Sequence, residues 1–224
     1  GAVRQRCTTP WLSPVPVLCI GNLVAGGAGK TPVAIAAGAI LRDLGKSVHF
    51  LSRGYGGCLS GPVQVDPSLH TAKQVGDEPL LLARVAPTWI AKNRAAGAKA
   101  AISNGADIIV MDDGFQNPSV SKTLSLLVVD GGYGFGNECV IPAGPLREPL
   151  SRGLARADAV ILMGEDVVGA VGSIHRTAPD MPVFNARLAA TSDAQRYVGA
   201  NILAFAGIGR PEKFFQSLRD LQCD

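Results

Sequence analysis

A glycine-rich loop between a strand-like run and a helix-like run constrains the fold of this 224-residue chain more than any other feature. The apolar run Val15–Ile20 is followed by Gly-Asn-Leu-Val-Ala-Gly-Gly-Ala-Gly-Lys-Thr-Pro, which spans residues 21–32. Glycines let backbone N–H groups close around phosphate oxygens, and a helix N-terminus adds about half a positive charge at the same place. This order predicts a strand, a phosphate-binding loop and a helix, with Pro32 in the first helical turn.

The end of this loop predicts which side chains touch a bound nucleotide. Lys30 is expected to reach the β- and γ-phosphates, and the Thr31 hydroxyl is expected to bind Mg²⁺. The residues that we assign to nucleotide binding are Gly26, Gly27, Ala28, Gly29, Lys30 and Thr31. The general pattern has a further glycine where this chain has Val24. The loop also resembles the GG-x-GKT loops of deviant P-loop ATPases and metallochaperone GTPases, although Ala25 replaces the signature lysine of those ATPases.

Alternation of apolar runs with helix-like stretches predicts the fold class. The predicted strands are Val15–Ile20, Val48–Leu51, Ile108–Met111, Leu124–Val129, Ala159–Met163 and Ile202–Phe205. The predicted helices are Thr31–Leu44, Glu78–Val85, Arg94–Ser103 and Glu212–Leu221. Several strands are apolar at nearly every residue, as in parallel sheets that are covered on both faces. We therefore predict an α/β fold with a doubly wound, mostly parallel sheet of the P-loop NTPase type, followed by the start of a smaller C-terminal lobe.

Length and composition bound the domains and the partners. We divide the chain into an N-terminal remnant (1–14), a P-loop kinase domain (15–166) and an incomplete second lobe (167–224), which begins with a weakly patterned stretch. A net charge of +3, without a long run of Lys or Arg, argues against a nucleic-acid partner. The five cysteines are scattered, which disfavours a disulfide framework or a zinc site. No apolar run approaches the roughly 20 residues of a membrane-spanning helix.

An acidic pair follows the predicted strand Ile108–Met111. Asp112 and Asp113 stand where P-loop enzymes have the carboxylate that holds Mg²⁺. The alternative is a strand that simply ends in a polar turn, and the phosphate loop upstream favours the metal interpretation. Because adjacent residues of a strand point to opposite faces, we expect only one of the two carboxylates to touch the metal directly.

Asp77 and three arginines are candidates for the transfer chemistry. Asp77 precedes a predicted helix, so it is either the helix N-cap or a base that accepts the proton of an attacking hydroxyl. Arg53, Arg94 and Arg147 are candidate bidentate clamps for phosphates, and the alternative for each is a solvated surface arginine. Glu148, next to Arg147, is either part of a structural ion pair or part of the magnesium shell.

Seven short blocks in a fixed order resemble one known family. They are Gly21–Leu23, Gly26–Pro32, Ser52–Gly57, Val75–Pro79, Asp112–Gln116, Pro142–Pro149 and Phe205–Pro211. This series resembles the tetraacyldisaccharide 4′-kinases, the lipid A 4′-kinases of Gram-negative bacteria. One block alone is a weak signal, whereas seven blocks in order across nearly the whole chain are highly specific.

The resemblance implies an activity and assigns residues to it. It implies transfer of the γ-phosphate of ATP, with Mg²⁺, to the 4′-hydroxyl of a tetraacylated glucosamine disaccharide 1-phosphate at the cytoplasmic face of the bacterial inner membrane. The implied partners are this lipid and the membrane surface, through peripheral contact or an N-terminal anchor. The implied site residues are Asp77, Lys30 and Arg147 for catalysis, Thr31, Asp112, Asp113 and Glu148 near the metal, and Tyr55, Arg53 and Arg94 near the substrate.

The sequence also departs from the family pattern, and two other functions stay open. Family members usually carry an N-terminal anchor and a C-terminal lobe with a histidine that supports the base, so we expect this chain to be truncated at both ends. Asn117 stands where the family often has histidine. The open alternatives are a nucleotide-switch GTPase or metallochaperone, and a remnant that binds nucleotide without transferring phosphate. The guanine-reading N-K-x-D motif and the Cys-rich metal motif of the former are absent from the sequence.

Overall fold

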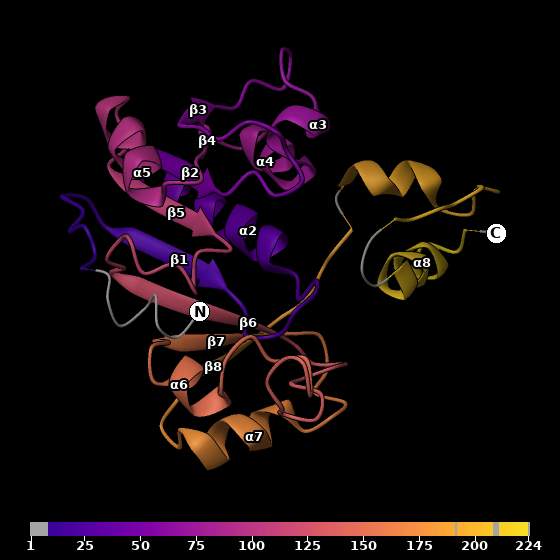
Figure 1. The fold of residues 1–224 in the computed structure, drawn as a ribbon. Coiled ribbons are helices and arrows are strands. Elements are labelled where there is room, and N and C mark those ends of the chain that lie inside the picture. Colours follow the sequence, from indigo (N-terminus) through magenta and orange to yellow (C-terminus); the bar gives the residue numbers. More distant parts are fainter. Residues whose placement is uncertain (1–8, 191, 208–210, 224) are drawn as a thin grey trace.

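The computed structural model describes residues 9–190, 192–207 and 211–223, and the statements below concern these residues. An eight-stranded sheet with helices on both faces forms the main body, and a smaller C-terminal segment stands apart from it (Figure 1). The strands are β1 (Val17–Gly21), β2 (Val48–Ser52), β3 (Val63–Gln64), β4 (Thr88–Ile90), β5 (Ile108–Asp112), β6 (Leu124–Asp130), β7 (Ala159–Met163) and β8 (Val183–Ala186). The helices are α2 (Lys30–Asp43), α3 (Ala72–Val75), α4 (Asp77–Ala83), α5 (Arg94–Ser103), α6 (Leu150–Leu154), α7 (Ala170–Thr177), the 3₁₀ helix η1 (Ser192–Tyr197) and α8 (Pro211–Asp220).

The sheet is parallel except at one edge, and this places the loops that follow its strands together. The strand order is β3-β4-β2-β5-β1-β6-β7-β8, and only the β3–β4 pair is antiparallel. Parallel strands need crossover connections, so the carboxyl ends of β2, β5, β1 and β6 lie at the same edge of the sheet. Ligands of open α/β sheets bind beyond this edge. The predicted doubly wound, mostly parallel fold is confirmed.

Alternate residues of the central strands face two separate apolar cores. Val17 and Cys19 of β1 pack in one core, which also holds buried residues of α5, α6 and α7. Leu18 and Ile20 pack in the other core, with buried residues of α2 and α4. Because side chains alternate along a strand, a strand that is covered on both faces is apolar at every position. This explains why the central strands were recognisable as continuous apolar runs.

The sequence prediction of the elements is correct for most of the sheet and wrong near the C-terminus. β1, β2, β5, β6 and β7 and the four predicted helices all form, with bounds that differ little from those expected. The predicted strand Ile202–Phe205 is wrong, because residues 201–207 form neither helix nor strand and the Leu203 side chain is 94% exposed. An apolar run becomes a strand only where a neighbour supplies hydrogen bonds, and none of the described strands pairs with this run.

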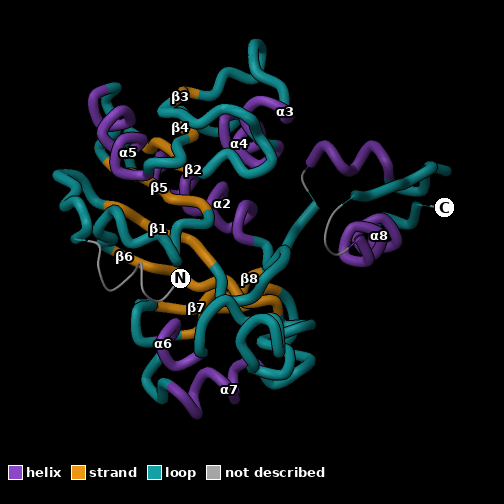
Figure 2. Tube along the Cα trace, in the orientation of Figure 1, coloured by secondary structure: helices purple, strands orange, loops and turns teal. Residues whose placement is uncertain are grey.

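The sheet continues past residue 167, where the sequence prediction placed the start of a second lobe. α7 and β8 come after that point, and β8 pairs in parallel with β7. The sheet therefore extends to Ala186, and the chain leaves it there for η1 and α8 (Figure 2). At the other end, the Trp11 N–H donates to the Ser119 carbonyl oxygen at 2.9 Å, so the segment before β1 packs against the domain. Among the described residues, no helix combines the length and the apolar character needed to cross a membrane.

His49 makes the stability of this fold depend on pH. It lies buried on β2, and its Nδ1 accepts a hydrogen bond from Trp89 Nε1 at 3.2 Å. Burial lowers the pKa of His49 below its usual value near 6.5, and Asp107 opposes this shift. At His49, the unfolded chain therefore binds more protons than the folded chain just below about pH 6.5, so the contribution of His49 to stability should fall as the pH drops through this range. We expect urea unfolding to show that His49→Gln gains stability relative to the unchanged chain between about pH 7.5 and 5. His175→Gln, at an exposed position, is the control.

Candidate active site

The phosphate loop has the conformation that its glycines allow. α2 begins at Lys30, directly after Gly29, whose φ of 88° is unfavourable for residues with a side chain. Gly26 also has a positive φ, of 123°. The buried Asn22 side chain braces the loop, because its Nδ2 donates to the carbonyl oxygens of Val24 at 2.7 Å and Gly26 at 3.2 Å. The backbone N–H groups at the start of α2 are therefore held in place at the carboxyl end of β1.

Val24 departs from the general P-loop pattern because this part of the loop is paired with another segment. Val24 forms an antiparallel bridge with Leu146. On either side of it, the Ala25 N–H donates to the Pro145 carbonyl oxygen at 2.8 Å, and the Arg147 N–H donates to the Leu23 carbonyl oxygen at 2.7 Å. A residue in such an extended pairing needs no positive φ, so a β-branched side chain fits where other P-loops have glycine.

Asp112 and Thr31 form an oxygen-rich pair beside the loop. Asp112 ends β5 with no exposed surface, and its Oδ2 accepts a hydrogen bond from Thr31 Oγ1 at 3.2 Å. Its Oδ1 is buried and has no hydrogen-bond partner among the described residues. Burial, and then the charges of Glu78 and Asp113, raise the pKa of Asp112 to about 7. A buried carboxylate oxygen without a partner is costly, so the pair fits Mg²⁺, which prefers oxygen ligands and binds through one or two carboxylates together with phosphates.

Asp112 and Asp113 both interact with Glu78 and Lys30, although we expected the two carboxylates to face opposite sides of a strand. β5 ends at Asp112, and Asp113 turns away with a φ of 53°, so strand alternation no longer applies. Its Oδ1 lies 3.7 Å from Lys30 Nζ and 3.3 Å from Arg147 Nη1. Lys30 and Arg147 thus meet at one carboxylate, and the structure brings these three predicted residues together.

Glu78 is a site residue that the sequence reasoning missed. It is the second residue of α4, and its carboxyl group interacts electrostatically with Lys30 and Asp113. Burial raises the pKa of Glu78 above its usual value, and the attraction of Lys30 opposes this shift. The available signal was that Glu78 is a second acid directly after Asp77. The sequence analysis used Glu78 only as the first residue of a predicted helix.

Asp77 is not the N-cap of α4. Gly76 holds that position with a φ of 90°, and Asp77 is the first helical residue, with an exposed side chain. Of the two roles expected for Asp77, the helix N-cap is therefore wrong. Asp77 instead lies in the first helical turn, where the helix dipole stabilises a carboxylate. The loop that carries Tyr55 lies against this point, because a Cβ on Gly76 would come within 2.5 Å of the Tyr55 carbonyl oxygen. The Tyr55 side chain itself is 79% exposed.

Arg94 and Arg53 follow the neighbouring strands β4 and β2. Arg94 is buried, and its Nη1 donates to the Ala91 carbonyl oxygen, while its Nε has no hydrogen-bond partner among the described residues. Burial, and then the charge of Arg53, lower the pKa of Arg94 to about 10. Arg94 is therefore not the solvated arginine that the sequence left as an alternative, whereas Arg53 is exposed. Two cations that repel one another beside the carboxylates fit an anionic ligand.

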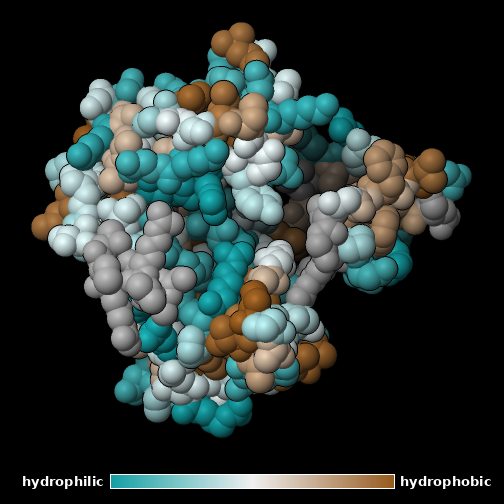
Figure 3. All heavy atoms as spheres, viewed as in Figure 1, coloured by the Kyte–Doolittle hydropathy of each residue, from teal (hydrophilic) through white to brown (hydrophobic). Residues whose placement is uncertain are grey.

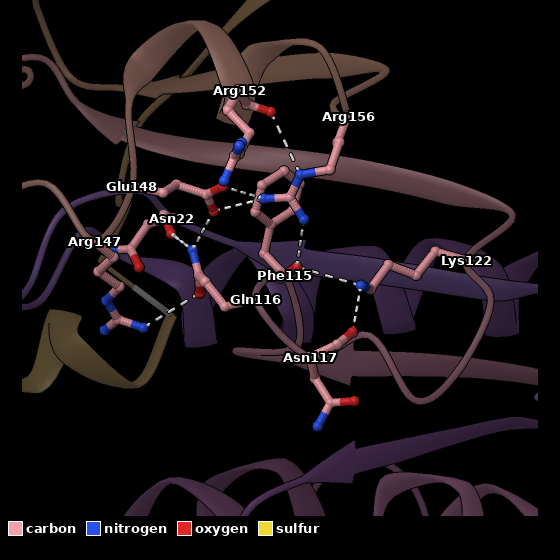
Figure 4. A network of polar contacts seen from close by, with 9 residues as sticks. All are labelled: Asn22, Phe115, Gln116, Asn117, Lys122, Arg147, Glu148, Arg152 and Arg156. Atoms are coloured by element: carbon pink, nitrogen blue, oxygen red, sulfur yellow. Dashed lines mark hydrogen bonds and ion pairs between the residues drawn. The ribbon is translucent and has the colours of Figure 1, made fainter. Parts of the chain in front are cut away.

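Glu148 pairs with an arginine that the sequence did not single out (Figure 4). Its carboxylate is buried, and Arg156 Nη2 donates to Oε1 at 2.5 Å and to Oε2 at 2.6 Å. Gln116 Nε2 donates to the same Oε1 at 3.3 Å. Of the two alternatives for Glu148, the structure contains the ion pair, although the partner is Arg156 and not the adjacent Arg147. Asn117 Oδ1 accepts hydrogen bonds from the Ser119 N–H and hydroxyl.

A cavity of about 680 Å³ lies between the phosphate loop and the C-terminal segment. Residues 27–32, Glu78 and Met163 line it from the sheet domain, and Leu188, Phe214 and Ser217 line it from the C-terminal side. Figure 3 shows the molecule hollowed between these two parts. The volume is in the range of small-molecule and cofactor sites.

Comparison with known families identifies the group to which this chain is related. A family model described as tetraacyldisaccharide-1-P 4′-kinase matches residues 1–224. The chain belongs to this family. The resemblance carried by the seven sequence blocks is therefore confirmed.

Relatives within the tetraacyldisaccharide 4′-kinase family match nearly all of this chain but are longer. The protein of that name from Rhodospirillum centenum is 58% identical, and the match covers 100% of this chain and 66% of the relative. The one from Gluconacetobacter diazotrophicus is 56% identical, over 96% of this chain and 65% of the relative. The chain thus spans just under two thirds of the length of these relatives.

A solved structure supports the fold assignment. The crystal structure of LpxK from Aquifex aeolicus in complex with ATP has a TM-score of 0.74 and 26% identity with this chain. The alignment covers 96% of this chain and 70% of that protein. The eight-stranded sheet described above is thus the sheet of this kinase family.

Proposed function

We propose that this chain carries the phosphoryl-transfer site of a lipid kinase. The reaction moves the γ-phosphate of ATP to the 4′-hydroxyl of a tetraacylated glucosamine disaccharide 1-phosphate in lipid A biosynthesis. The observation that carries the proposal is the hydrogen bond from Thr31 of the phosphate loop to the buried carboxylate of Asp112, whose other oxygen has no hydrogen-bond partner among the described residues. The relatives that bear the kinase name and the LpxK structure in complex with ATP support the same activity.

The phosphate loop and its neighbours would bind the triphosphate. The N–H groups of Gly26–Gly29 and the Lys30 ammonium would hold phosphate oxygens, and Thr31 and Asp112 would hold Mg²⁺. When bound, Mg²⁺ would neutralise charge on the phosphate oxygens. Asp113 would keep Lys30 and Arg147 directed at the same place, since its carboxylate contacts both cations.

Transfer needs a base that accepts the hydroxyl proton, and we assign this role to Asp77. Its side chain is exposed, and its charge acts on the neighbouring Glu78. In the proposed step, the 4′-oxygen forms a bond to the γ-phosphorus while the bond from that phosphorus to the bridging oxygen of ADP breaks. The hydroxyl proton passes to the Asp77 carboxylate. Arg147 would stabilise the transferring group, and Arg53, Arg94 and Tyr55 would contact the phosphorylated sugar.

The lipid itself would bring the protein to a bilayer. Each buried CH₂ group contributes about 0.8 kcal/mol to lipid association, so a substrate with several acyl chains can hold an enzyme at the membrane surface. We propose peripheral action at the cytoplasmic face of the bacterial inner membrane, where ATP is available, or attachment there through an N-terminal anchor. Nucleic acid is not among the proposed partners.

The direct test is transfer of label from γ-labelled ATP to the detergent-dispersed tetraacylated disaccharide 1-phosphate in the presence of Mg²⁺. Labelled lipid would establish the kinase. ATP binding without labelled lipid would instead favour a chain that binds nucleotide without transferring phosphate. A preference for GTP over ATP in the same binding assay would favour the switch-GTPase alternative.

Replacement of Asp77 tests the proposed base. Asp77→Asn should reduce transfer by on the order of 10²–10⁴-fold, because the amide accepts no proton. ATP affinity should change by less than about threefold, since among the described residues no hydrogen bond or ion pair joins Asp77 to the phosphate loop. Initial rates and equilibrium ATP binding separate the two effects, with the exposed Asp43→Asn as control. Normal transfer by Asp77→Asn would contradict the assignment of Asp77 as the base and leave it only a structural role in the first turn of α4.

A further inference from the structure

A short segment links the phosphate loop to the acidic pair. This segment, Pro145–Glu148, is called here the clamp segment. Its backbone pairs with the phosphate loop on both sides of Val24, and its Arg147 side chain reaches Asp113. The position of Arg147 over Asp113 therefore depends on how the clamp segment is held at its other end, at Glu148.

Arg156 holds that end. It follows α6, and its Nη2 donates to both oxygens of Glu148 at 2.5 and 2.6 Å. Its Nη1 donates to the Phe115 carbonyl oxygen at 3.3 Å, and the guanidinium lies 4.5 Å from the centre of the Phe115 ring. Figure 4 shows Arg156 between the Glu148 carboxylate and the Phe115 carbonyl. One side chain thus joins the clamp segment to the loop that follows Asp112 and carries Asp113.

Gln116 connects Glu148 to Arg147 through hydrogen bonds with both side chains. Its Nε2 donates to the Asn22 carbonyl oxygen at 2.8 Å and to Glu148 Oε1 at 3.3 Å. Its Oε1 accepts from Arg147 Nη1 at 3.5 Å, the same nitrogen that lies 3.3 Å from Asp113 Oδ1. A carboxylate only accepts hydrogen bonds, so Glu148 requires the Gln116 amide to direct its NH₂ group inward and its oxygen at Arg147.

This arrangement matters because the Arg147–Asp113 contact is weak in isolation. Both side chains are about one-third exposed, at 30% and 36%, and an exposed ion pair fixes geometry poorly. The Arg156–Glu148 pair is different, because Glu148 is 9% exposed and both of its oxygens are bound by one planar guanidinium. The Arg156–Glu148 pair, which has a fixed geometry, can therefore orient the more exposed Arg147–Asp113 pair.

We propose that Arg156 is a positioning residue for phosphoryl transfer, which acts through Glu148 and Gln116 to keep Arg147 directed at Asp113. The proposal rests on the proposed kinase function. It also gives Glu148 a role as the acceptor that orients Gln116 and the clamp segment, in place of a role as a magnesium ligand.

The test begins with Arg156→Met, which keeps an unbranched side chain over the Phe115 ring. We expect kcat for lipid phosphorylation to fall about tenfold or more while KM for ATP changes less than about threefold, because the phosphate loop keeps its own contacts. Arg176→Met is the matched control, since it removes an arginine of α7 that is 70% exposed and pairs with Glu138. The control should retain the kcat of the unchanged chain.

A second variant separates positioning from stability. Arg156→Met leaves the buried Glu148 carboxylate without its cation, so the melting temperature should fall. The double variant Glu148→Gln/Arg156→Met removes both charges and should recover most of the melting temperature without recovering kcat, because Gln116 then faces an amide that can donate as well as accept. Arg156→Lys should give an intermediate kcat, since an ammonium keeps the charge but lacks the fork that reaches Glu148 and Phe115 together.

A binding measurement keeps this test independent of the kinase assay. The Mg²⁺ concentration for half-maximal Mg²⁺-dependent ATP binding should shift about threefold or more in Arg156→Met, because Arg147 would then no longer neutralise Asp113 next to Asp112, and it should stay unchanged in Arg176→Met. Unchanged Mg²⁺ dependence together with unchanged kcat would overturn the proposal, as would recovery of kcat in step with melting temperature in the double variant. If the unchanged chain phosphorylates no lipid, the proposed function fails, and the Mg²⁺ measurement alone then decides the role of Arg156.

Discussion

Lys30→Ala is expected to lower lipid phosphorylation by on the order of 10³-fold or more. Lys30 is 8% exposed at the first position of α2, and its ammonium lies 3.7 Å from Asp113 Oδ1. In a water-poor site, a fixed cation at the phosphates stabilises the charge that moves toward the leaving oxygen during transfer. Its loss acts on the transition state more than on the fold, because Asp113 keeps Arg147 as a partner.

The measurement is the initial rate of label transfer, alongside ATP binding at equilibrium. ATP affinity should also fall, because the lysine contacts phosphates before as well as during transfer. Lys46→Ala changes an exposed lysine just after the same helix and serves as the control. A rate for Lys30→Ala within about tenfold of the unchanged chain would contradict the assignment of residues 21–32 as the catalytic phosphate loop.

Asp112→Asn is expected to reduce transfer by on the order of 10²–10³-fold and, without ligand, to flatten the pH dependence of stability. The folded pKa of Asp112 is raised from 3.8 to about 7, so its carboxyl group is most favourable to folding at low pH. That contribution is lost as the pH rises from about 4 through 7, since the folded chain must then bury a charge. The neutral amide of the variant does not ionise, so its stability should not show this decline.

Urea unfolding between pH 4 and 8 measures this effect, first without ligand and then with Mg²⁺ and ATP. The ligand should stabilise the unchanged chain much more than Asp112→Asn, because a ligand that binds only the folded state adds stability according to its affinity. Asp180→Asn, at an exposed turn, is the control. If Mg²⁺ and ATP stabilised both chains equally, the assignment of Asp112 as a metal ligand would be wrong.

The parts of the fold that were predictable from the sequence are those fixed by local pattern. The phosphate loop was recognisable because its glycines, Lys30 and Thr31 lie in one short run whose conformation depends on neighbouring residues. The central strands were recognisable because burial on both faces makes them continuously apolar. β4 and β8 were missed because they are short, and Phe184 of β8 remains 58% exposed at the edge of the sheet.

The contacts within the site were less predictable, because they depend on which way a loop turns. Arg147 and Glu148 are adjacent, and an ion pair at this place was one of the two alternatives that the sequence left open for Glu148. In an extended segment, neighbouring side chains point to opposite sides, so Arg147 faces Asp113 and Glu148 faces Arg156. Similarly, Asp113 leaves the strand with a positive φ, and no strand periodicity predicts that it joins Asp112 at the same cluster.

The pairing of the phosphate loop with the clamp segment has a consequence for the thermodynamics of nucleotide binding. Glycine-rich loops are costly to immobilise, and a free loop would lose conformational entropy when a triphosphate ordered it. Here the hydrogen bonds from Ala25 to Pro145 and from Arg147 to Leu23 hold that loop in the absence of ligand. Part of this ordering cost is therefore met during folding, and more of the binding energy of the phosphates is left to stabilise the complex itself.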